Sequence, residues 1–249
     1  MYNAGAIAGP LIGGFIGEQF GLRNLYLFSA ISFLLSTLMI FFIRRQEVEP
    51  RQPKSGRDFF SNRRYVIFLA VVFIAIFAMY LPQPLTSNFL QNQRGVSVRE
   101  IGILGSVSSL GNVLLTLGMG FFHPGAGLLL GQIAMGVFAL LLWRTSQFQW
   151  YALGYLLMGG YRAARAMISA QIGTLISKEN MGLAFGITET VGGIAIILAP
   201  PLAGLLYDRD PLLVFQVTCG AIIIAVMVSF LYYLAKNQQQ VPVQGVIDG

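Results

Sequence analysis

The stretch Gly5-Ala-Ile-Ala-Gly9-Pro10-Leu-Ile-Gly13-Gly14 is apolar, and glycine recurs in it every fourth residue. Residues four apart lie above one another on a helix, so Gly5, Gly9 and Gly13 share one face. In water each glycine would cost about 1 kcal/mol relative to alanine. In lipid the backbone has no other hydrogen-bond partner, and a bare face admits a neighbouring helix. The stretch therefore predicts a closely packed membrane helix, which Pro10 is expected to bend.

The same pattern returns near the other end of the chain. Pro200 lies 190 residues after Pro10, and in that register Gly204 matches Gly14. This offset is too long for a solenoid repeat. It suits a bundle of six membrane helices, at about 30 residues per helix and connection. The sequence therefore predicts two related halves.

Apolar spans are unevenly divided around one basic segment, residues 44–64. Two spans precede this segment and six follow it. About four helices are therefore expected to be missing from the front, at roughly 30 residues for each helix together with its connection. The predicted spans are 1–17, 24–43, 65–86, 100–122, 125–143, 150–176, 182–206 and 212–235. Residues 83–99 are expected to form the longest external connection.

Composition gives the protein class. The chain is 55% hydrophobic and 10% charged, whereas soluble domains carry about 25% charged residues. We therefore expect an all-α polytopic membrane protein. Cys219 is the only cysteine, so no internal disulfide can form, and His123 is the only histidine, so no metal site and no cofactor are predicted.

The net charge of +6 reflects membrane topology. Seven of the sixteen basic residues lie within 44–64, and they are not interleaved with aromatic residues as in a nucleic-acid-binding stripe, so no nucleic-acid partner is expected. The positive-inside rule places this segment in the cytoplasm. The eight spans then place both termini of a multi-pass cell-membrane protein in the cytoplasm.

The motif around Gly5, Gly9, Pro10, Gly13 and Gly14 resembles the antiporter motif on the fifth helix of drug:proton antiporters in the major facilitator superfamily. Leu81-Pro82 through Gly105 also resembles the passage from the seventh to the eighth helix in these exporters. The resemblance implies twelve helices in two halves joined by a basic cytoplasmic loop. It also implies proton-driven export of a small amphiphilic or drug-like molecule by alternating access, with substrate, protons and lipid as partners.

This resemblance divides the chain into four parts. The last two helices of the front half occupy 1–43, and the basic linker occupies 44–64. The second six-helix half occupies 65–236, and a disordered cytoplasmic tail occupies 237–249.

Three ionisable residues, Arg162, Arg165 and Glu189, lie deep inside predicted spans. A charge at the bilayer centre costs at least about 2.5–3.5 kcal/mol, so such residues usually face a cavity or a partner. Arg165 and Glu189 are equally far from residue 177, so an antiparallel hairpin would place them at similar depth as an ion pair. The pair could be a structural bridge or gate, Glu189 could carry protons, and Arg162 could contact substrate. Other large side chains are expected to pack between helices, namely Met158, Met167, Phe73 and Phe77.

Two other function classes stay open at this point. An intramembrane enzyme would need clustered catalytic groups, and one intramembrane carboxylate with no membrane histidine argues against an enzyme. A non-transporting fragment of a transporter is the other alternative. No G-x-x-x-x-G-K-[ST] motif is present, which disfavours direct coupling to ATP. The substrate, the coupling ion and the oligomeric state are not determined by the sequence.

Overall fold

The computed structural model describes residues 2–42, 62–177 and 180–238. The all-α prediction is confirmed, because these residues form helices and contain no strand. In chain order the helices are α1 (Tyr2–Ile40), α3 (Arg63–Tyr80), α4 (Gln83–Arg94), α5 (Val98–Met119), α6 (Pro124–Arg144), α7 (Phe148–Met158), α8 (Gly160–Leu175), α9 (Met181–Arg209) and α10 (Leu213–Gln238).

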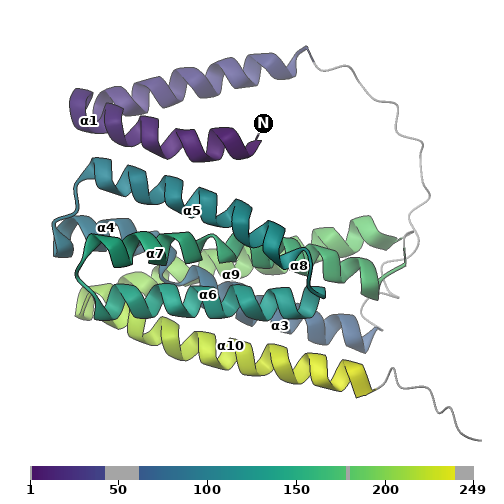
Figure 1. Cartoon of the computed structure of the whole chain (residues 1–249). Coiled ribbons are helices and arrows are strands. Elements are labelled where there is room, and N and C mark those ends of the chain that lie inside the picture. The colour runs from purple at the N-terminus through teal and green to yellow at the C-terminus, as the bar shows by residue number, and fades with distance from the viewer. Residues whose placement is uncertain (1, 43–61, 178–179, 239–249) are drawn as a thin grey trace, which may run out of the picture.

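The helices from α3 to α10 form a bundle, and α1 folds into a hairpin that lies along α5 at one edge of this bundle (Figure 1). The helix α10 lies on the opposite side of the bundle and packs on α3 and α6. Six helices of the described residues are long and apolar enough to cross a membrane. The prediction of a multi-pass membrane protein is therefore confirmed.

The hairpin of α1 turns at Gly21, where φ is 81° and ψ is 156°. A side chain would strain this backbone conformation, which glycine adopts freely. The first span was predicted to end at residue 17, whereas the first arm stays helical almost to Gly21. The helix also continues through Pro10, so the interruption lies at the glycine rather than at the proline.

The predicted external connection at 83–99 is wrong for most of its length, because Gln83–Arg94 is the helix α4. Pro84 lies in the first turn of this helix, where the missing amide hydrogen costs nothing. Phe89 and Leu90 are fully buried and anchor α4 to the bundle. The polar composition of this segment suggested a connection without regular structure, but burial of a few apolar side chains stabilises a helix there.

The start of α5 is fixed by a capping box. The Ser97 hydroxyl accepts a hydrogen bond from the Glu100 amide at 3.3 Å, and the Ser97 amide donates to the Glu100 carboxylate at 2.8 Å. Just before it, Gly95 turns the chain with φ at 66°. This short connection sets where α5 begins and thus where its glycines meet α1.

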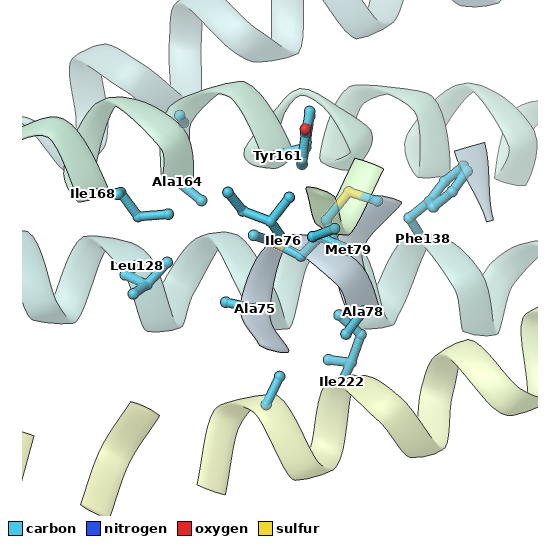
Figure 2. Packing of buried hydrophobic residues seen from close by; sticks show 14 of the residues in the cluster. Ala75, Ile76, Ala78, Met79, Leu128, Phe138, Tyr161, Ala164, Ile168 and Ile222 are labelled. Atoms are coloured by element: carbon cyan, nitrogen blue, oxygen red, sulfur yellow. The ribbon is translucent and has the colours of Figure 1, made fainter. Parts of the chain in front are cut away.

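The core lies around α3, which is enclosed by neighbouring helices on several sides. Figure 2 shows α3 side chains between residues of α6, α8 and α10. The labelled members of this cluster are Ala75, Ile76, Ala78, Met79, Leu128, Phe138, Tyr161, Ala164, Ile168 and Ile222. The core therefore fixes α8 on one side and leaves its other side, with the two arginines, outside the apolar cluster.

Two predicted segments lie mostly outside the described residues. Of the linker at 44–64, only 62–64 is described, and there Asn62 caps α3 through its side-chain oxygen. Of the tail at 237–249, residues 237–238 complete α10. The division of the chain into a partial front half and a complete second half stays a prediction.

Candidate functional site

The first arm of α1 meets α5 through backbone-to-backbone contact. A methyl group built on Gly102 would lie 2.5 Å from the Pro10 carbonyl oxygen and 2.9 Å from the Gly14 Cα. Such distances leave no room for a side chain, because interiors are already close-packed. Pro10 and Gly14, both predicted from the motif, therefore form the surface on which α5 rests.

Two further contacts extend this surface along α5. The Ser106 hydroxyl donates a hydrogen bond to the Ile7 carbonyl oxygen at 2.6 Å. A methyl group on Gly105 would lie 2.9 Å from the Pro10 Cβ. Small residues thus recur on α5 wherever α1 approaches, as expected for close helix pairs in membranes.

Among the glycines spaced four apart on the first arm of α1, Gly17 is the one whose added methyl group would touch a described residue of α5. Gly5 and Gly9 have no atom of the described structure within 4 Å of an added methyl group. An added methyl group on Gly13 would lie 3.8 Å from Leu25 on the second arm, and one on Gly17 would lie 3.4 Å from both Leu25 and Val98, the first residue of α5. The predicted glycine face therefore packs partly against the second arm of its own hairpin and, at Gly17, against the start of α5.

Glycine also packs the junction between α7 and α8 closely against α5. A methyl group on Gly159 would overlap the Asn112 amide, and one on Gly111 would overlap the Leu156 carbonyl. The predicted single span at 150–176 is divided at Gly159 into the two helices. Because this junction cannot shift without moving α5, it fixes the start of α8 and the arginines that follow.

A cavity of about 640 Å³ lies between these elements. It has the size of small-molecule sites, which span about 300–1,000 Å³. Its lining comes from α1 (Gly5, Ala6, Pro10), α5 (Gly105, Ser108, Ser109), α7 (Met158) and α8 (Arg162). Met158 packs against the core cluster, as expected, and it also forms part of the cavity wall.

Among the described residues that line this cavity, Arg162 is the only charged one. It lies close to halfway between Phe148, where α7 begins, and Leu175, where α8 ends. Its side chain is exposed, and no ion pair joins it to another described residue. The cavity therefore holds an unbalanced positive charge near the middle of the span.

Arg165 and Glu189 form the ion pair that the sequence predicted, between α8 and α9. The side chain of Arg165 is 31% exposed and that of Glu189 is 56% exposed. The pair is therefore half-open rather than sealed, and the carboxylate can be reached from outside the bundle.

Tyr161 lies beside the pair with Tyr80 against its ring, and sequence reasoning missed both of them. The Tyr161 hydroxyl is close enough to Arg165 to interact electrostatically, and its ring lies 5.8 Å from that of Tyr80. The Tyr65 hydroxyl donates to the Ala184 carbonyl at 2.8 Å and contacts Thr188 Oγ1 at 3.1 Å. The four-residue spacing of Tyr161 and Arg165 was the one available signal, since such residues share a helix face.

The repeat counterparts Pro200 and Gly204 both lie inside α9. An added methyl group on Gly204 has no described atom within 4 Å. Thus Gly204 does not reproduce the contact of Gly14, and within the described part of the chain the two positions are not equivalent in packing. Among the same residues, no three histidine, cysteine or acidic side chains gather where a metal ion could bind.

Comparison with known proteins supports the family resemblance that the sequence motifs indicated. A multidrug resistance protein, MdtG of Dickeya zeae, is 28% identical over 116 residues, which are 44% of this chain and 28% of the relative. A multi-drug resistance efflux pump, PmrA of Streptococcus pneumoniae, is 34% identical over 79 residues, which are 30% of this chain and 20% of the relative. The matched stretches thus span less than a third of either relative.

A solved structure described as a bacterial metal transporter shares the fold. Its TM-score is 0.67 at 15% sequence identity, and the match covers 93% of this chain and 63% of that protein. The family model of the Major Facilitator Superfamily matches residues 1–83 and 67–247. Nearly the whole chain is covered, so the protein belongs to the Major Facilitator Superfamily.

Proposed function

We propose that the protein is a secondary transporter that exports a small amphiphilic or drug-like molecule in exchange for protons, by alternating access. The cavity between α1, α5 and the α7–α8 junction is the observation that carries this proposal. It lies near mid-span, where transporters of this architecture bind their substrates. The names of the two relatives, a multidrug resistance protein and a multi-drug resistance efflux pump, point in the same direction.

The contact between α1 and α5 is suited to the movement that alternating access requires. Gly14 and Gly102 meet through backbone atoms, so no interlocking side chains need to separate when one helix shifts against the other. Rocking of one bundle against the other about a central site is the usual motion of such transporters. We assign this contact as the sliding surface.

Glu189 is the proposed proton carrier. Protonation removes its negative charge and dissolves the ion pair with Arg165, which joins α8 to α9. Because the side chain is more than half exposed, a proton can reach it from outside the bundle. The proposed orientation keeps both ends of this chain and the linker at 44–64 in the cytoplasm.

The test uses the protein as its gene encodes it, reconstituted in liposomes with an imposed pH gradient. A panel of acidic, neutral and basic fluorescent amphiphiles is the substrate set. We expect the wild type to transport at least one probe when a pH gradient is imposed. Glu189→Gln should lower the rate of this gradient-driven transport at least tenfold, while the same variant should still exchange the probe across the membrane without a gradient. Glu100→Gln, which alters only the cap of α5, is the matched control.

Two results would contradict this function. Transport by the wild type that ignores the pH gradient would remove proton coupling. Equal loss of gradient-driven transport and of exchange in Glu189→Gln would make the pair a structural bridge instead.

A further inference from the structure

We propose that Arg162 binds an anionic group of the transported molecule, so that the substrates are small amphiphiles carrying a sulfonate, carboxylate or similar acid. This inference rests on the proposed transport function and adds the chemical class of substrate. It follows from the charge balance, the hydrogen-bonding groups and the shape of the cavity.

The charge balance comes first. An arginine near the centre of the membrane costs at least about 2.5–3.5 kcal/mol unless a counter-charge or water compensates it. Glu189 is the nearby carboxylate, and Arg165 already holds it. Within the described residues Arg162 therefore has no anionic partner, and an anion that enters the cavity would supply one.

The polar groups of the lining are suited to bind a hydrogen-bond acceptor such as an acid group. Arginine offers five donors in a fork that matches two oxygens of one acid group. The Ser109 hydroxyl donates to the Gly105 carbonyl at 3.2 Å and keeps its lone pairs, and the Ser108 hydroxyl makes no hydrogen bond to another described residue. No carboxylate lines the cavity, so a cationic ligand would find repulsion from Arg162 and no described compensating charge.

The remaining wall suits an apolar body. Ala6, Pro10 and Met158 add aliphatic surface to the lining beside the serines and the arginine. Methionine adapts to ligands of different shape because its side chain is unbranched and polarizable. A flat or branched hydrocarbon body with one acid group fits a site of about 640 Å³.

The experiment compares three probes that share a naphthyl body: 2-naphthalenesulfonate, 2-naphthalenesulfonamide and 2-naphthylmethylammonium. At neutral pH these are an anion, a neutral molecule and a cation. Binding to the detergent-purified protein, as its gene encodes it, is measured by titration calorimetry, and uptake is measured in liposomes. The variants are Arg162→Gln, Arg162→Lys and, as a control cation at the end of α9, Arg209→Gln.

We expect the wild type to bind and transport the sulfonate in preference to the cation. Arg162→Gln should weaken sulfonate binding at least tenfold and leave sulfonamide binding within twofold, which also shows that the variant is folded. Arg162→Lys should keep part of the sulfonate affinity, because the charge remains while the forked geometry is lost. Arg209→Gln should match the wild type.

The inference is overturned if the wild type shows no saturable sulfonate binding, or if Arg162→Gln weakens sulfonate and sulfonamide equally. A lower melting temperature in Arg162→Gln with unchanged probe discrimination would show that another part of the protein neutralises Arg162, which also overturns it. Gradient-driven transport of the cation alone would leave the proposed function standing and remove only this inference.

Discussion

Gly14 and Gly102 meet so closely that a methyl group built on Gly14 would lie 3.0 Å from the Cα of Gly102. The glycine of the antiporter-like motif thus has its partner on α5, far away in the sequence. The contact joins the hairpin α1 to the bundle beside the cavity. The two backbones can come this close because neither glycine has a side chain.

Gly102→Ala is expected to destabilise this contact by about 1–3 kcal/mol, the usual cost of overpacking. The added methyl group would meet backbone atoms of Pro10 and Gly14, which cannot rotate away. Thermal unfolding in detergent and liposome transport measure the effect. Gly118→Ala in the same helix has open space around its added methyl group and should behave as the wild type. Wild-type stability and transport in Gly102→Ala would contradict the packing described here.

Arg165→Ala and Glu189→Ala are expected to be non-additive. Removing either partner already breaks the ion pair, so the double variant should lose less than the sum, with a coupling energy of about 0.5–3 kcal/mol. The cycle is measured by thermal unfolding and by transport. Pairing Glu189→Ala with Arg209→Ala supplies the control, which should be additive. Strict additivity in the first cycle would show that the two side chains act independently.

Gly159→Ala is expected to lower stability and transport together. Its methyl group would overlap the Asn112 amide of α5, which forces the α7–α8 junction outward and displaces Arg162 from the cavity. Gly173→Ala is the control in α8, because its nearest contact would be the Met181 side chain at 3.9 Å. Wild-type thermal stability and transport in Gly159→Ala would show that the junction can accommodate the methyl group, which would contradict this prediction.

The hydrogen bond between Gln132 and Ser229 joins α6 to α10 in the core. The Gln132 Nε2 donates to the Ser229 hydroxyl at 2.8 Å, and both side chains are fully buried. Ser229→Ala should cost about 0.6 kcal/mol, the typical value for such bonds in membranes. Adding Gln132→Leu should recover stability, because no polar amide is then left unpaired. A double variant less stable than Ser229→Ala would contradict this account.

The spans and the ion pair could be predicted because their signals are local. Long apolar runs mark membrane helices by length alone. Arg165 and Glu189 are symmetric about the α8–α9 turn, so an antiparallel pair of helices had to bring them to one level. The helix α4 was missed because a polar stretch with Pro84 looks like a loop until the burial of Phe89 and Leu90 is known.

The cavity could not be predicted from the sequence. Ser108, Ser109 and Met158 are ordinary residues of apolar helices, and only the packing of α1 against α5 and of the α7–α8 junction brings them around Arg162. The glycines of the motif showed that one helix would be approached closely. They did not show which glycine would be used, because that depends on how the hairpin rotates about its own axis.

The sequence by itself determined that the chain crosses a membrane repeatedly as helices, because hydrophobic length and backbone hydrogen bonding in lipid leave no other choice. The tertiary structure alone decided that Pro10 and Gly14 rest on Gly102 while Gly5 and Gly9 stay open. It also decided that Arg162 faces a cavity while Arg165 holds Glu189. The reason is physical: helix formation depends on neighbours in the chain, whereas the orientation of each helix depends on the shape of the helices packed against it.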